Sequence, residues 1–202
     1  AKTKYKKPNK EKKLNGKSHN KFSQKEVDQL IDLITKAKKP IFYTGGGVIN
    51  SGPKASELLR ELVSLTGFPI TSTLQGLGAY PGDDPQFLGM LGMHGTYQAN
   101  MAMHNADLIL AIGARFDYRI TNTPSKFAPK AKIVHFDVDH SSVSKIIEAD
   151  IAVFGQVKNS LQAKRIELYH LEMVEPCIGD LFPIEIRRPT IAQNVVYLGV
   201  WI

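Results

Sequence analysis

The feature that most constrains the fold of this 202-residue chain is a series of short apolar runs, each closed by glycine or a polar turn. A continuous apolar run of this length is typical of a strand that is covered on both faces of a sheet. Segments with helical spacing separate the runs, and this alternation favours a doubly wound sheet with right-handed crossovers. The sequence therefore predicts an α/β, Rossmann-like domain with a mostly parallel sheet of five to six strands. The expected strands cover residues 41–44, 70–74, 108–112, 133–138 and 151–155.

Helix signals lie between these runs. Ser23 and Glu26 have the spacing of a capping box, and apolar residues recur at helical intervals after them, which predicts a helix over residues 24–38. Pro53 stands where a second helix would begin, after the glycine loop at 45–47. Glycines and prolines after residue 74 predict a long loop. Further helices are expected over residues 95–106 and 143–148.

Charge is concentrated at one end of the chain. The net charge is +7, but residues 1–25 contain ten lysines and one glutamate, or +9, so the remainder carries −2. We interpret residues 1–22 as a lysine-rich linker or tail rather than a nucleic-acid-binding arm, which is the alternative. The expected nucleotide-binding domain covers residues 23–157. Prolines interrupt residues 158–202, which are left unassigned.

Several classes of protein are disfavoured. No apolar stretch reaches the roughly 18 residues of a membrane span, and no secretory signal is recognisable, so a soluble, cytoplasmic protein is expected. The single cysteine, Cys177, excludes an internal disulfide and a multi-cysteine metal site. No hydrolase, metalloprotease or phosphate-loop motif occurs, so we assign no catalytic and no metal-binding residue. His135 is expected to be a satisfied core residue, and Asp83 and Asp84 to belong to a turn.

A ligand site is predicted where the strands end. Ligands of open parallel sheets bind beyond the carboxyl ends of the strands, where glycines let backbone N–H groups approach a phosphate. Here those ends carry residues 45–47, 73–76 and 113–115 and Asp137. The pattern favours a bound nucleotide, although a tight turn alone would also explain the glycine triplet.

Three polar side chains are candidates for contact with this ligand, and two of them, Arg115 and His94, also have an alternative interpretation. Asp137 follows a strand, as a ribose-binding acid does, but lies far from the glycine triplet, which disfavours an ordinary NAD dehydrogenase. Arg115 would neutralise a pyrophosphate, or else form a surface ion pair with Asp117. His94 would contact a planar ligand, or else cap the next helix.

Four blocks resemble, in order and spacing, the central domain of the acetohydroxyacid synthase (acetolactate synthase) large-subunit family, which are thiamine-diphosphate enzymes. They are residues 39–47 (KPIFYTGGG), 73–78 (TLQGLG), 90–96 (MLGMHGT) and 113–117 (GARFD), and the resemblance covers about residues 24–157. In that family the domain binds FAD in a structural role. The parent enzyme condenses pyruvate with pyruvate or 2-oxobutyrate toward branched-chain amino acids.

The resemblance also implies partners and cofactors. The parent enzyme uses thiamine diphosphate and Mg²⁺, held by flanking domains, and is expected to form a homo-oligomer with a regulatory small subunit; no nucleic acid and no membrane are expected. Two positions depart from the family: Tyr118 and Gln156 each stand where a carboxylate is usual. The implied FAD contacts are Gly46, Thr73, Leu74, Leu91, Gly92, Met93, His94, Gly113, Ala114, Arg115, Phe116, Asp117, Asp137 and Val138.

The sequence lacks the motifs that the family uses for thiamine diphosphate catalysis. The family needs a glutamate that activates the cofactor and a Gly-Asp-Gly segment with a downstream asparagine, and neither motif occurs in this sequence. We therefore expect a central domain or fragment that is inactive alone. The alternatives are a self-standing FAD- or ADP-binding module without catalysis, and the same domain of a related enzyme such as glyoxylate carboligase.

Overall fold

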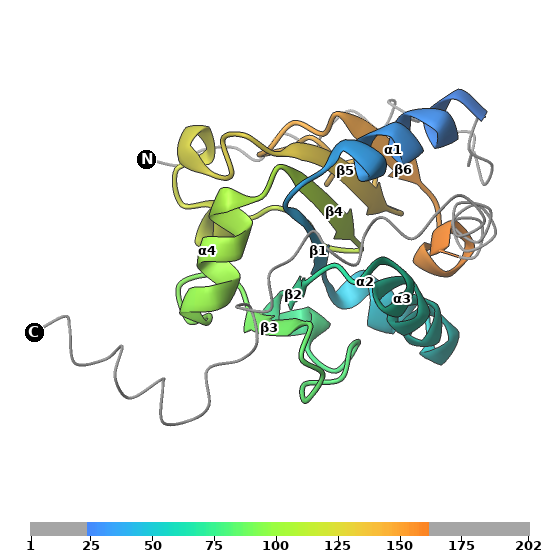
Figure 1. Ribbon diagram of the computed structural model, residues 1–202, viewed down its shortest axis with the longest axis horizontal. Helices are drawn as coiled ribbons and strands as arrows, with labels where there is room; N and C mark the ends of the chain where they lie inside the picture. The colour runs from blue at the N-terminus through green and yellow to red at the C-terminus, as the bar shows by residue number, and fades with distance from the viewer. Residues whose placement is uncertain (1–23, 162–202) are drawn as a thin grey trace, which may run out of the picture.

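The computed structural model describes residues 24–161, which form one parallel six-stranded sheet (Figure 1). The strands lie in the order β3-β2-β1-β4-β5-β6. This architecture confirms the predicted doubly wound α/β fold. The expectations for residues 1–22 and for residues beyond 161 lie outside the described part of the chain. The strands are β1 (Pro40–Thr44), β2 (Ile70–Ser72), β3 (Phe87–Met90), β4 (Leu108–Ile112), β5 (Lys132–Asp137) and β6 (Ile151–Phe154).

Helices cover both faces of the sheet (Figure 1). The long helices α1 (Gln24–Lys36) and α3 (Pro53–Thr66) lie on one face, and α4 (Tyr97–Asn105) lies on the other. Because successive strand residues point to opposite faces, Phe42 packs into the core under α1 and α3, whereas Ile41 and Tyr43 pack into the core under α4. The short elements are α2 (Gly46–Asn50), η1 (Leu74–Gly76), α5 (Tyr118–Thr121) and η2 (Pro124–Lys126).

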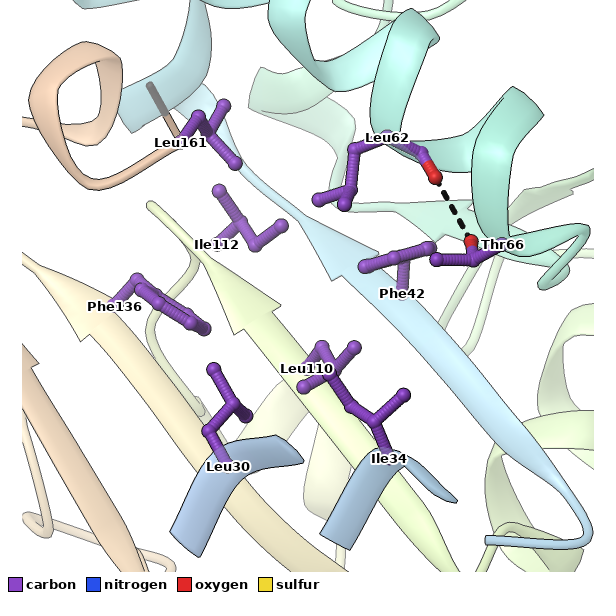
Figure 2. A pocket seen from close by; sticks show the side chains of 9 residues that line it. All are labelled: Leu30, Ile34, Phe42, Leu62, Thr66, Leu110, Ile112, Phe136 and Leu161. Carbon is purple, nitrogen blue, oxygen red and sulfur yellow. Dashed lines mark hydrogen bonds between the residues drawn. The ribbon is translucent and has the colours of Figure 1, made fainter. Parts of the chain in front are cut away.

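A small apolar void remains where α1 and α3 meet the sheet (Figure 2). Its volume is about 20 Å³, and the Thr66 hydroxyl at its wall already donates to the Leu62 carbonyl at 2.9 Å. A space of this size with apolar walls offers water no hydrogen-bond partners, so we treat it as a packing defect and not as a ligand site. Its lining residues are Leu30, Ile34, Phe42, Leu62, Thr66, Leu110, Ile112, Phe136 and Leu161.

The structure corrects the prediction of a helix over residues 143–148. This stretch forms turns, and Ser144 has a positive φ of 55°. The carboxylate of Asp139 accepts hydrogen bonds from the hydroxyls of Ser141 and Ser142, and the Ser144 hydroxyl accepts one from the Ala149 N–H. These local side-chain bonds compete with helix formation, as serine and aspartate commonly do.

Two further elements differ from the sequence-based expectation. The edge strand β3 lies within the region expected to be a loop, and its register against β2 shifts between Ile70 and Ser72. The glycine triplet, expected to be a loop, instead begins the short helix α2, with Gly45 as its N-cap residue.

Candidate functional site

The carboxyl ends of all six strands meet at one edge of the sheet, because every strand pair is parallel. The strand order reverses between β1 and β4, which is the point where dinucleotide-binding sheets hold their ligand. The order itself is that of a Rossmann sheet. We call this edge the carboxyl rim; it carries residues 45–47, 73–76, 91–95, 113–117 and 137–138.

Glycines pack the backbone closely at the reversal point. A Cβ atom on Gly45 would lie 2.7 Å from the Ala114 Cα, and one on Gly47 would lie 2.7 Å from the Gly113 Cα. Gly47 also donates its N–H to the Gly113 carbonyl at 3.0 Å. Gly46 differs, since a Cβ there would meet only ordinary contacts at 3.4 Å. Two glycines of the triplet are thus explained by chain packing, and Gly46 is the one with room for a ligand.

Large apolar side chains stand exposed along the carboxyl rim. Met93 is 80% exposed, Leu74 is 70% exposed and Val138 is 66% exposed, and each lies within three residues of the carboxyl end of a strand. Apolar side chains that stay exposed together on one edge of a sheet are candidates for contact with a ligand. All three are among the positions implied by the resemblance.

The loop before α4 is held by a residue that the sequence did not single out. The Asn100 side chain accepts from the Gly92 N–H at 3.2 Å and donates to the Gly92 carbonyl at 3.0 Å. Thr96 caps α4 by accepting from the Ala99 N–H. The alternative role of His94 as a helix cap is therefore wrong, and its ring is exposed at the rim.

Arg115 is exposed and forms no ion pair within the described part of the chain. The alternative partner, Asp117, instead caps α5 by accepting from the Arg119 N–H at 2.9 Å. The backbone of Arg115 is fixed from below, because the buried Tyr43 hydroxyl donates to its carbonyl at 3.3 Å. Burial, and secondarily the charge of Asp117, raises the pKa of Tyr43, so this hydroxyl stays a donor. The rim thus holds a cation on an anchored backbone.

Asp137 ends β5 with a partly exposed carboxylate. Its Oδ1 accepts from the Asp139 N–H at 2.9 Å, and its Oδ2 lies 3.7 Å from the Nε2 of His135. Burial alone would raise the pKa of Asp137, but the contacts with His135 and with the backbone N–H groups of Asp139 and Val138 outweigh it and lower the pKa. The carboxylate is therefore an anionic acceptor at neutral pH.

Three other predicted contacts reach the rim through backbone only. The side chains of Leu91, Ala114 and Phe116 are buried in the core under α4, so any contact that they make with a ligand would depend on main-chain atoms. Thr73 caps η1 by accepting from the Gly76 N–H at 3.0 Å, and this bond leaves the O–H of Thr73 as a donor.

Two carboxylates at the opposite edge of the sheet already have partners within the fold. The carboxylate of Asp107 accepts from the backbone N–H groups of Lys38 and Lys39, each at 2.8 Å. Asp150 pairs with the Lys132 ammonium at 2.8 Å. These two carboxylates therefore hold the fold together, whereas Arg115 on the carboxyl rim forms no ion pair with a described residue.

A hollow of about 300 Å³ lies beside the rim, between α4 and the segment 120–127, and sequence reasoning did not find it. Of the predicted site residues only Leu91 borders it. Its polar wall includes the side chains of Asn100 and Lys126. No sequence motif marks it, because α4 and this segment meet only in the folded chain.

Two kinds of feature are absent from residues 24–161. This part of the chain contains no cluster of three or more histidine, cysteine, aspartate or glutamate side chains suited to a metal ion. It also contains no helix both long and apolar enough to cross a membrane.

Comparisons with known proteins agree on one family. Residues 27–164 match the family model of the thiamine pyrophosphate enzyme central domain. The chain is 47% identical over 152 residues to the acetolactate synthase large subunit of Buchnera aphidicola from Schlechtendalia chinensis, covering 74% of this chain and 26% of that protein. It is 45% identical over 156 residues to the acetolactate synthase isozyme 3 large subunit of Escherichia coli, covering 77% and 27%.

The similarity extends to plants. The chain is 48% identical over 136 residues to the chloroplastic acetolactate synthase of Arabidopsis thaliana, covering 67% of this chain and 20% of that protein. The chain thus spans about a quarter or less of the length of these curated relatives. The matches favour the acetolactate synthase interpretation over glyoxylate carboligase and over a self-standing module.

Proposed function

Because this chain belongs to the thiamine pyrophosphate enzyme family as a central domain of the acetolactate synthase large-subunit type, we propose that it binds FAD along its carboxyl rim. The FAD has a structural role and takes no part in electron transfer. The domain extends over residues 23–157, with residues 1–22 as a linker or tail.

The observation that carries this proposal is that one rim presents both a cation without an ion-pair partner and exposed apolar side chains. Arg115 has no ionic partner among the described residues, and Leu74, Met93 and Val138 are each more than 60% exposed. FAD combines an anionic diphosphate with flat apolar rings, so its chemistry fits both features. A purely anionic ligand would leave the apolar groups uncovered.

Each part of the rim has a proposed task. The Arg115 guanidinium neutralises the diphosphate through charge-assisted hydrogen bonds, and the Gly46 backbone allows the ligand to approach closely. The Asp137 carboxylate accepts hydrogen bonds from ribose hydroxyls. Met93, His94 and the other exposed rim residues contact the planar rings. The remaining positions, whose side chains are buried or used as caps, contribute main-chain atoms.

We further propose that the domain acts within an acetolactate synthase. In that enzyme, other domains hold thiamine diphosphate and Mg²⁺, and pyruvate condenses with pyruvate or 2-oxobutyrate. A homo-oligomer, a regulatory small subunit and a cytoplasmic location belong to the same proposal. Support comes from the names of the relatives, which include large subunits.

Titration of the purified full chain with FAD tests the binding proposal. Flavin fluorescence should change saturably, and ADP should displace the flavin, because both ligands share the diphosphate and ribose. FMN lacks the adenosine half and should compete poorly. Absence of saturation at millimolar FAD would contradict the proposal, and displacement by FMN but not by ADP would contradict the assignment of Arg115 and Asp137.

A further inference from the structure

His135 is buried in an unusual way for an imidazole. Its side chain is fully buried in β5, and neither ring nitrogen has a hydrogen-bond partner in the described part of the chain. A buried polar atom without a partner destabilises a fold, because it has lost its hydrogen bonds to water. The expected core position of His135 is confirmed, but its ring nitrogens are not satisfied by a hydrogen bond from any described residue.

The sheet leaves room for this ring. His135 lies in register with Ala111 of β4 on one side and with Ala152 of β6 on the other. The edge of the ring meets Phe116, with ring centroids 5.5 Å apart at an interplanar angle of 84°. Two small neighbours and an aromatic wall thus fix the imidazole plane without giving either nitrogen a partner.

Among the described residues, a polar group that lies close to the ring is the carboxylate of Asp137. Because strand residues two apart point to the same face, Asp137 lies one step closer to the carboxyl rim than His135 on the same side of the sheet. Its Oδ2 is 3.7 Å from Nε2, slightly beyond hydrogen-bond length. A small rotation of the carboxylate would close this gap, while Oδ1 stays held by the Asp139 N–H.

We propose that His135 is a positioning residue, whose Nε2–H holds the Asp137 carboxylate in the orientation with which it receives a ligand at the carboxyl rim. The claim that Asp137 receives a ligand rests on the proposed function. The contact between His135 and Asp137 does not, because it exists within the fold. An unpaired buried imidazole beside a rim carboxylate is otherwise unexplained.

Four variants of the full chain and one control variant separate positioning from packing. His135→Leu removes both nitrogens and keeps an apolar side chain, whereas His135→Gln keeps an N–H donor. Asp137→Asn removes the carboxylate charge, alone and combined with His135→Leu. Ile133→Val is the matched control, because Ile133 is buried in the same strand on the same face but lies farther from the rim.

The first measurement needs no ligand. The Asp137 carboxyl carbon is followed by NMR as the pH is lowered, in wild type and in both His135 variants. In wild type the pKa should lie below its ordinary range, it should rise in His135→Leu, and His135→Gln should fall between them. An Asp137 titration that His135→Leu leaves unchanged would overturn the proposal, whatever the chain binds.

The second measurement is affinity, with FAD and ADP as probes. His135→Leu should weaken both by about three- to tenfold without lowering the melting temperature, and His135→Gln should restore part of the loss. In the Asp137→Asn background His135→Leu should have no further effect. Equal losses in both backgrounds would overturn positioning. If wild type bound neither probe, the proposed function would fail, and the carboxyl titration alone would decide the His135–Asp137 contact.

The control makes the pattern specific. Ile133→Val should lower the melting temperature, since a buried methylene is lost, while leaving affinity and the Asp137 titration unchanged. If affinity instead fell in proportion to stability in both strand variants, His135 would be a packing residue only.

Discussion

At the scale of single residues, Arg115 carries the strongest expectation about binding. It is exposed and has no ionic partner in the described chain, and its neighbour Asp117 is occupied as the cap of α5. Arg115→Ala should weaken FAD and ADP binding by about 10- to 100-fold, because a hydrogen bond to a charged group is lost. The melting temperature should barely change, since no ion pair is broken.

Arg115→Lys is the matched variant. Lysine keeps the charge but loses the planar fork of donors, so its affinity should lie between those of wild type and Arg115→Ala. Flavin fluorescence titrations of the three proteins measure this. Equal affinities in all three would mean that Arg115 does not contact the ligand.

The glycines of the carboxyl rim differ in role, which three alanine variants reveal. A methyl group on Gly45 would overlap the Ala114 backbone, so Gly45→Ala should destabilise the fold by about 1–3 kcal/mol or more. Gly82→Ala is the control, because nothing lies within 4 Å, and its effect should stay within about 0.5 kcal/mol. Gly46→Ala should fold normally but bind FAD more weakly. Urea unfolding and flavin titration test these results, and a Gly45→Ala protein as stable as wild type would contradict the packing account.

At the scale of elements, α1 packs on the sheet through a small set of apolar side chains. Leu30 and Ile34 are its buried apolar residues among those described, and both border the small void of Figure 2. Leu30→Ala should cost about 2–5 kcal/mol, because it enlarges a space that the neighbours do not fill. Gln29→Ala, at an exposed position of the same helix, is the control. If chemical denaturation gave equal stabilities for the two variants, α1 would not be part of the cooperative core.

Elements marked by a continuous run of apolar residues could be predicted from the sequence, whereas elements set by local polar interactions could not. The apolar runs in β1, β4 and β5 are visible in the sequence, and in the structure most of their residues are buried. β3 escaped prediction because its four residues are half-buried at the sheet edge and include a glycine at φ 92°. The turns at 143–148 escaped because Asp139 captures serine hydroxyls.

The candidate site, like the fold, could be predicted only in part from the sequence. The glycine and arginine positions on the rim follow from strand ends, which the sequence marks clearly. The roles of Asn100 and Tyr43 did not follow, because each acts on a backbone group, Gly92 or Arg115, that is distant in sequence or held by a different element. No local pattern reveals such a partnership.

At the scale of the whole molecule, we expect the chain to bind a cofactor without catalysing a reaction. Supplied with thiamine diphosphate, Mg²⁺, FAD and pyruvate, the purified chain should form no acetolactate, because its sequence has no Gly-Asp-Gly segment to hold a magnesium diphosphate. A complete acetolactate synthase in the same colorimetric assay is the positive control. Turnover by the pure chain would show that residues assigned here to the fold perform chemistry.

The central claim concerns where the ligand lies, and NMR mapping tests it most directly. Adding FAD to ¹⁵N-labelled protein should shift the amide signals of Gly46, Met93, Arg115 and Val138 on the carboxyl rim in one saturable process. Signals of Lys39, Asp107 and Lys132 on the opposite edge, far from the strand ends that form the carboxyl rim, should stay unchanged. Shifts concentrated on that opposite edge, or saturable binding that leaves the carboxyl rim unperturbed, would contradict the account.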